Sequence, residues 1–344
     1  MKIGFILSYA AFSSTNGIRS QAISWKNGLE KLNHEVALIN MWEDNQWCQY
    51  DAIVIFGFSV YSCDFINILS TVHKNILVAP ILDPNYSILA LKIYSRWGNR
   101  KLRLTNPYYS LRQVKDKVRA FLIRSNFEKA YLIGGFGIPK EKCHIVPLSC
   151  GISKPKELFE KEKFCLHISL LCDERKNVKR LIKASKKYGF RLVLAGKLRN
   201  QKEKKLLNTW IDSADNIEYR GYVSHEEKME LYTKAKVFAL PSTNEGVGIV
   251  ALEAAAMGCD IVITKLGGPK EYYSNMATVI NPYNVDEIGK AICKALDTKS
   301  FQPNLAEYIN KNYSTKITFC NLISLEAAPI IRWKFPDSTT FFKV

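Results

Sequence analysis

The chain has 344 residues, of which 47% are hydrophobic, and its formal net charge is +17. This length suffices for two globular domains, and no apolar stretch approaches the roughly 18 residues of a membrane-spanning helix. The nine cysteines show no C-x-x-C pair and no metal-ligand spacing with histidine, which excludes a zinc finger or a disulfide scaffold. We therefore expect reduced core thiols in a cytoplasmic protein.

Short apolar runs alternate with amphipathic stretches in the first half of the chain, a pattern typical of a doubly wound sheet. Residues 3–9 are predicted to open it as a strand rather than an export signal, because Ser8 and Tyr9 interrupt the apolar run. The Asn16-Gly17 turn and a helix follow. Further strands are predicted at 34–39, 52–58, 75–82, 118–123 and 142–147. We assign residues 1–150 to a first, Rossmann-like domain.

Basic and aromatic side chains are concentrated within residues 92–142. This stretch contains 13 basic and 3 acidic residues, a net charge of +10. The interleaved aromatic residues are Tyr94, Trp97, Tyr108, Tyr109 and Phe121. Such a composition suits an anionic surface, either lipid headgroups or nucleic acid. We expect an anionic membrane surface and no nucleic acid, with a solvated basic face as the alternative.

A polar, charged stretch at residues 151–163, interrupted by Pro155, is predicted to be a linker. A second Rossmann-like domain is predicted over 151–326. Its strands are predicted at 165–170, 190–196, 217–223, 237–241 and 260–264, and its helices at 178–188, 203–212, 226–235 and 285–296. Two prolines in the tail, 327–344, disfavour a long helix. We expect this tail to pack near the hinge or the first domain, or to touch a membrane.

The most informative segment runs from Pro241 to Gly258 and reads PSTNEGVGIVALEAAAMG. Its predicted strand, loop and helix place Glu245 at the carboxyl end of a strand and Glu253 about two turns into the next helix. Ligands of open α/β sheets bind at this edge, over helix amino termini that attract phosphate. The two carboxylates could accept hydrogen bonds from hydroxyls, so the pattern indicates a nucleotide-sugar site. The structural alternative is a loop glutamate and a helix glutamate beside a turn.

The same segment closely resembles the donor-binding signature of retaining GT-B glycosyltransferases of family 4, or glycosyltransferase group 1. The matching residues are Pro241-Ser242, Glu245-Gly246-Val247-Gly248, Glu253, Gly258, 261–264, Gly267-Gly268 and Glu271. The resemblance is specific over 164–296 and covers only the order of elements over 1–152. It implies an α/β fold of the GT-B type, with two Rossmann-like doubly wound domains facing across a cleft.

The resemblance implies that Glu253 holds the ribose hydroxyls and that Glu245 orients the sugar. Glu245 would be aided by the backbone amides of the glycine turn, whose residues are Gly246, Val247, Gly248 and Ile249. Lys176, with Arg175, would stabilise the diphosphate. A basic helix start facing water is the alternative for these two residues.

Three further positions follow from the resemblance. The nucleotide base would rest on backbone groups near Tyr222 and Val223. Gly17 corresponds to the glycine loop of the first domain. Asp83 stands where many members place a histidine that contacts the transferred sugar, although an aspartate before proline also starts turns.

One departure from the family concerns the Gly-Arg pair after the first strand of the second domain, because Ser169 and Leu170 hold those positions. Arg175 is the only nearby arginine, at a different spacing. The chain also has no Asp-x-Asp motif, which agrees with a site that needs no metal and no cofactor.

These observations favour a metal-independent, retaining hexosyltransferase that uses a nucleotide-sugar donor. The expected acceptor is a saccharide, lipid-linked or polyprenyl-linked, in bacterial capsule or lipopolysaccharide assembly. We expect a cytoplasmic protein, peripheral on the inner face of the plasma membrane. The alternatives are a nucleotide-sugar epimerase on the same fold and a non-catalytic GT-B binding subunit.

Overall fold

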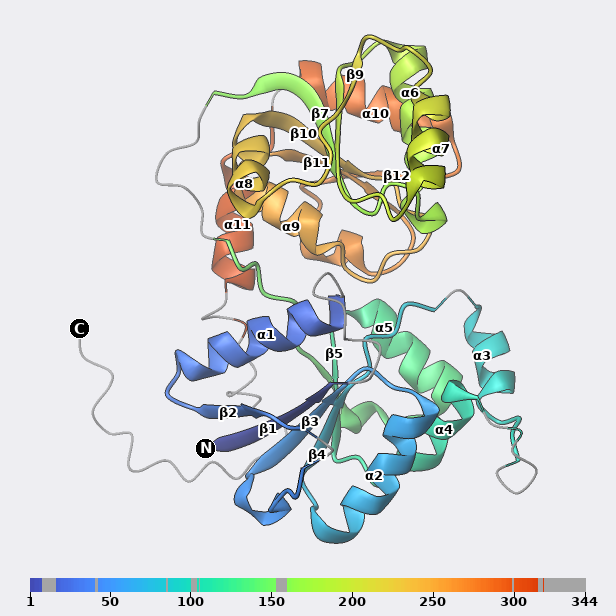
Figure 1. Cartoon of the computed structure of the whole chain (residues 1–344), viewed down its shortest axis with the longest axis vertical. Helices are drawn as coiled ribbons and strands as arrows, with labels where there is room; N and C mark the ends of the chain where they lie inside the picture. Colours follow the sequence, from blue (N-terminus) through green and yellow to red (C-terminus); the bar gives the residue numbers. More distant parts are fainter. Residues whose placement is uncertain are drawn as a thin grey trace.

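The computed structural model describes residues 1–7, 17–40, 43–84, 86–99, 104, 106–152, 160–298, 300–314 and 318. The expected tail at 327–344 and the loop that contains Asn16 lie outside these residues. Two parallel sheets, each covered by helices, lie one above the other along the long axis of the molecule (Figure 1).

The first sheet has the strand order β2-β1-β3-β4-β5-β6, and every pairing in it is parallel. Its strands are β1 (Lys2–Leu7), β2 (Glu35–Leu38), β3 (Ala52–Phe56), β4 (Ile76–Ala79), β5 (Ala120–Ile123) and β6 (Cys143–Ile145). All residues of β3, β4 and β5 are buried, as expected for a parallel sheet covered on both faces. The accompanying helices are α1 (Gly17–Glu30), α2 (Val60–Val72), α3 (Ile88–Tyr94), α4 (Pro107–Val114) and α5 (Asn126–Tyr131).

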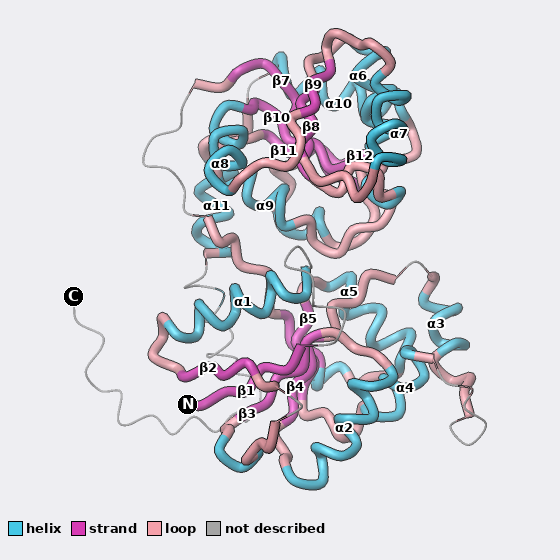
Figure 2. Tube along the Cα trace, in the orientation of Figure 1, coloured by secondary structure: helices cyan, strands magenta, loops and turns pink. Residues whose placement is uncertain are grey.

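The second sheet is also parallel, with the order β12-β11-β10-β7-β8-β9. Its strands are β7 (Glu162–Ile168), β8 (Leu192–Ala195), β9 (Ile217–Tyr219), β10 (Ala235–Leu240), β11 (Asp260–Thr264) and β12 (Thr278–Ile280). Its helices are α6 (Val178–Tyr188), α7 (Gln201–Ile211), α8 (His225–Lys234), α9 (Ile249–Ala256), α10 (Val285–Asp297) and α11 (Asn304–Tyr313). Figure 2 shows these helices on both sides of the strands.

Two predicted boundaries in the second domain are wrong. Strand β7 begins at Glu162, inside the predicted linker, because the strand extends along the neighbouring β10, where Glu162 pairs with Ala235. The predicted strand at 217–223 ends at Tyr219, since Gly221 has a φ of +76° and turns the chain away. The predictions also omitted β12.

The segment that leaves the first domain pairs with a segment near the end of the described chain. The backbone N–H of Cys150 donates to the carbonyl of Tyr313 at 2.6 Å, and Cys150 forms an isolated parallel bridge with Ser314. The end of α11 therefore lies beside the segment that connects the two sheets.

Candidate functional site

The loops after β7 and β10 bring Lys176 and Glu245 together, because these two strands are neighbours in the sheet. The Nζ of Lys176 lies 2.6 Å from Oε2 of Glu245, which also accepts a hydrogen bond from Ser242 Oγ at 3.0 Å. The two side chains of the ion pair are only 21% and 12% exposed. Partial burial strengthens their attraction relative to a surface pair, so the carboxylate is held in one orientation.

Glu253 lies on α9 and has its own cation. Its Oε2 accepts hydrogen bonds from Lys228 Nζ at 2.9 Å and from Tyr232 OH at 3.0 Å, both on α8. Burial, and then the nearby Glu253 carboxylate, raise the pKa of Tyr232 well above its ordinary value, so the phenol stays protonated and donates. Sequence reasoning missed Lys228 and Tyr232, although their spacing places them on one face of a helix.

The glycine turn between the two glutamates fits tightly. Gly248 has a φ of +75° and begins α9, which has no side-chain cap, while Val247 is buried and Ile249 is the first helical residue. An added Cβ at Gly246 would lie 2.1 Å from Asp83 Oδ1 and 2.8 Å from Arg124 Nη1. The turn therefore contacts the first domain through its bare backbone.

Asp83 follows β4 and pairs with Arg124, which follows β5. The distance from Arg124 Nη2 to Asp83 Oδ1 is 2.7 Å, and Arg124 Nε also donates to the buried Glu128 at 3.1 Å. Burial lowers the pKa of Arg124, but the carboxylates of Glu128 and Asp83 outweigh this effect and raise the pKa above its ordinary value. Sequence reasoning missed this arginine; its only signal was the spacing of Arg124 and Glu128, four residues apart.

The loop after β11 connects the two domains. The carboxylate of Glu271 accepts hydrogen bonds from the backbone N–H groups of Asn126 at 2.7 Å and Phe127 at 2.8 Å, at the start of α5. The hydroxyl of Tyr272 donates to the Arg124 carbonyl at 2.7 Å and accepts from the Leu148 N–H at 3.0 Å. Burial raises the pKa of Tyr272, which keeps this donor protonated.

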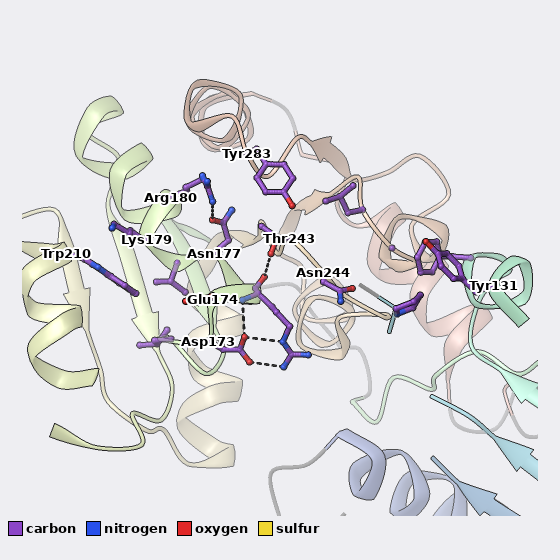
Figure 3. Close-up of a pocket in the computed structure, with 17 residues that line it drawn as sticks. Tyr131, Asp173, Glu174, Asn177, Lys179, Arg180, Trp210, Thr243, Asn244 and Tyr283 are labelled. Carbon is purple, nitrogen blue, oxygen red and sulfur yellow. Dashed lines mark hydrogen bonds and ion pairs between the residues drawn. The ribbon is translucent and has the colours of Figure 1, made fainter. Parts of the chain in front are cut away.

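The guanidinium of Arg175 donates two hydrogen bonds to Asp173, at 3.1 and 2.8 Å (Figure 3). Both residues line a pocket of about 780 Å³ that also includes Pro84, Asn244 and Tyr283. The hydrogen-bonded carboxylate of Asp173 is the main cause that raises the pKa of Arg175. The charges of Glu245 and Asp83 raise this pKa further. The arginine therefore lies within the electrostatic field of the candidate site without bonding to either glutamate.

The remaining predicted residues lie at the edges. Tyr222 is exposed on the loop before α8, Val223 packs against the core of the second domain, and Gly17 is exposed at the first position of α1. An added Cβ at Gly17 would meet nothing within 4 Å. The structure does not place these three in contact with the two glutamates.

The position of the missing Gly-Arg pair has a different arrangement. The buried His167 ring is bonded to the Ala239 carbonyl at 2.8 Å and to Ser169 Oγ at 2.7 Å. Burial lowers the pKa of His167 to about 4, so its ring is neutral near pH 7. Gly196, with a φ of +148°, would place a Cβ 1.8 Å from the Ser169 carbonyl. The backbone after β8 can therefore approach the backbone after β7 this closely only because residue 196 is a glycine.

Among the residues that the structure describes, no group of three or more His, Cys, Asp or Glu side chains could hold a metal ion. No helix in the same ranges is long and apolar enough to cross a membrane.

Comparisons with known proteins agree on the second domain. Residues 152–313 match the family model described as glycosyl transferases group 1. The O-antigen chain mannosyltransferase B of Escherichia coli is 26% identical over 218 residues, 56% of this chain and 55% of that protein. This chain thus matches about half the length of that curated relative.

Solved structures resemble the whole architecture. A sucrose-phosphate synthase from Thermosynechococcus elongatus superimposes with a TM-score of 0.72 at 14% identity, over 95% of this chain and 98% of that one. HepE from Anabaena, in complex with UDP, gives a TM-score of 0.68 at 15% identity, over 95% and 100% of the two chains. These similarities confirm the expected fold, two Rossmann-like domains of the GT-B type.

Proposed function

We propose that this chain, whose residues 152–313 match the glycosyl transferases group 1 family, transfers a hexose from a nucleotide-sugar to a saccharide acceptor with retention. The observation that carries the proposal is the pair of glutamates, each bonded to its own lysine, on either side of the start of α9. The mannosyltransferase relative supports a hexose, and the UDP complex of HepE supports a nucleotide-linked donor.

Glu253 would hold the ribose hydroxyls, because Lys228 and Tyr232 fix its carboxylate in place. Glu245 would orient the hexose, at the edge of the sheet where α/β proteins bind ligands. The sugar would release Glu245 from Lys176, and the lysine would then face the leaving diphosphate. A preorganised cation of this kind stabilises the negative charge that develops on the leaving group.

The start of α9 would bind the diphosphate together with Lys176. Gly248 leaves this helix without a side-chain cap, and uncapped amide groups at a helix N-terminus attract anions. Gly246 permits the close approach of a ligand to the backbone. Since lysine and amides supply the positive charge, we propose a reaction without a metal, and EDTA should leave the rate unchanged.

The first domain would bind the acceptor. Asp83 lies at the interdomain contact beside Gly246, where a transferred sugar would meet its acceptor. The basic stretch 92–142 supports a lipid-linked saccharide, since positively charged residues bind anionic membrane surfaces. We propose that the protein works at the cytoplasmic face of a bacterial plasma membrane, in surface polysaccharide assembly.

Thermal unfolding with nucleoside diphosphates and their hexose derivatives tests the donor site. A ligand at 100 times its Kd stabilises the folded protein by about 2.7 kcal/mol, so a cognate nucleotide gives a clear shift. Transfer to a saccharide acceptor, with NMR of the product, then reports the anomeric configuration. Conversion of the nucleotide-sugar without any acceptor would instead indicate an epimerase, and binding without turnover a non-catalytic subunit.

A further inference from the structure

The outer face of α3 exposes a stripe of large apolar side chains. Leu89, Ile93 and Trp97 are 67%, 49% and 77% exposed. They are spaced four residues apart, and hydrogen bonds from the N–H groups of Ser95, Arg96 and Trp97 continue the helical turn beyond Tyr94. Residues at this spacing lie on one side of a helix, so the three side chains form one continuous surface.

The opposite face of α3 holds the helix in place. Leu91 is completely buried, and Ser95 Oγ donates a hydrogen bond to the Gly135 carbonyl at 2.7 Å. An added Cβ at Gly134 would lie 2.6 Å from Ile88, so the helix packs directly against the backbone of that turn. The apolar stripe is therefore directed outward by packing on the other side.

Basic residues border the stripe. Lys92 on α3 and Arg96 in the turn that follows it are both exposed. Residues 86–104 contain five basic and no acidic side chains; three of these, Arg100, Lys101 and Arg103, lie outside the described residues. Tyr86 and Tyr94 add aromatic rings beside the helix, with their centroids 5.3 Å apart. Apolar and aromatic groups bordered by cations match the chemistry of an anionic lipid surface.

A second helix of the same domain provides a comparison. Ile68 and Val72 are 69% and 54% exposed on α2. That helix carries Asp64, and the exposed Lys74 just beyond its end balances this charge, whereas Lys92 and Arg96 have no acidic neighbour on α3. Exposed apolar side chains alone therefore do not distinguish α3. The combination with positive charge does, and α3 lies at the side edge of the first domain (Figure 1).

We propose that the outer face of α3 docks on an anionic lipid bilayer. Leu89, Ile93 and Trp97 insert at the level of the headgroups, and Lys92 and Arg96 contact the lipid phosphates. This inference rests on the proposed function. Docking would hold the first domain at the membrane surface, where a lipid-linked acceptor lies. The second domain contributes nothing to the docking surface and stays free to bind the donor.

The test is sedimentation of the full chain with vesicles of phosphatidylglycerol and phosphatidylcholine, and with phosphatidylcholine alone. We expect binding to the anionic vesicles that weakens with salt. The triple variant L89S/I93S/W97S and the double variant K92Q/R96Q should each lose at least about tenfold of this binding. The matched control I68S/V72S should bind like the wild type. Circular dichroism and size-exclusion chromatography check that each variant is folded and report its oligomeric state.

Several outcomes would overturn the docking. The docking would be refuted if the wild type does not bind vesicles, if either α3 variant binds as the wild type does, or if the control loses as much binding as the α3 variants. It would also be refuted if the wild type is an oligomer and the triple variant is a monomer. The last would make this face an interface between copies. The thermal shift by nucleotides is measured on the same variants. Loss of vesicle binding with an intact nucleotide shift supports the docking, whereas an absent shift in the wild type would contradict the proposed function alone.

Discussion

The backbone of Gly246 lies so close to Asp83 that a Cβ at this glycine would fall 2.1 Å from Asp83 Oδ1. The donor loop of the second domain therefore meets the Asp83 side chain of the first domain at a position that has no side chain of its own. Asn244 also donates a hydrogen bond to the Asp83 carbonyl at 3.3 Å. Approach of the two domains at this point depends on a residue without a side chain.

Replacing Gly246 with alanine should separate the two domains at this contact. A misplacement of about 1 Å can reduce turnover on the order of 100-fold, so we expect transfer to fall by about that factor. Nucleotide affinity should change much less, because the Glu253 cluster lies wholly in the second domain. Kinetics and calorimetry on the same preparation measure both. The control is Gly151→Ala, whose Cβ would meet nothing within 4 Å; equal effects of both variants would contradict the explanation.

The two glutamates should respond differently to the same substitution. Hydrogen bonds to a charged group contribute about 1.5–3 kcal/mol, so Glu253→Gln should weaken nucleoside diphosphate binding by about 10- to 100-fold. Glu245→Gln should leave that affinity nearly unchanged and lower kcat, since Glu245 is assigned to the sugar. Calorimetry with the diphosphate, followed by steady-state kinetics, separates the two roles. A large loss of diphosphate affinity in Glu245→Gln would refute the assignment.

Arg124→Gln should destabilise the folded protein. The variant would leave Glu128, which is 1% exposed, and Asp83 without their cation. Breaking a buried ion pair costs about 3–5 kcal/mol. Arg199→Gln is the matched control, because Arg199 also pairs with a glutamate four residues away but is 60% exposed. That surface change should cost less than about 1 kcal/mol. Urea denaturation compares the two, and similar losses would argue against the burial of Arg124.

Acidic pH should lower the free energy of unfolding because His167 is buried in its neutral form. In the unfolded chain this residue binds a proton near pH 6.5, whereas burial lowers its pKa in the folded protein to about 4. As the pH falls from 6.5 to 4, the unfolded state holds the extra proton, so stability decreases by up to about 3 kcal/mol. Urea denaturation of the wild type and of His167→Gln at pH 7 and pH 4.5 tests this. The variant should lose less stability between the two pH values; an identical loss would show that His167 is not responsible.

Local patterns in the sequence were enough to predict most of the fold. Strand β3 is a continuous apolar run, and β10 and β11 each contain a shorter one, VFAL and IVI. Strand β12 has only three residues, one of them exposed. Such a short edge strand has too little hydrophobic pattern to be recognised.

The candidate site was predictable where it depends on one segment and not where it depends on pairing. The positions of Glu245 and Glu253 follow from a strand, a turn and a helix. Arg124 was missed because its partner Asp83 lies 41 residues away, and nothing local indicates the contact. The close approach of Gly196 to the Ser169 carbonyl likewise joins the ends of two different strands, and no local pattern indicates it.

The bridge between Cys150 and Ser314 has a mechanical consequence. Two backbone segments, rather than one, run together at the connection between the domains. Because the Cys150 N–H is bonded to the Tyr313 carbonyl, the connection is tied to the end of α11, and the motion of one domain relative to the other should be restricted at this point. Restricting the motion in this way raises the effective concentration of one binding surface near the other. When the two domains close over a ligand, they would then lose little rotational freedom. The same residues of the two domains would come into contact each time.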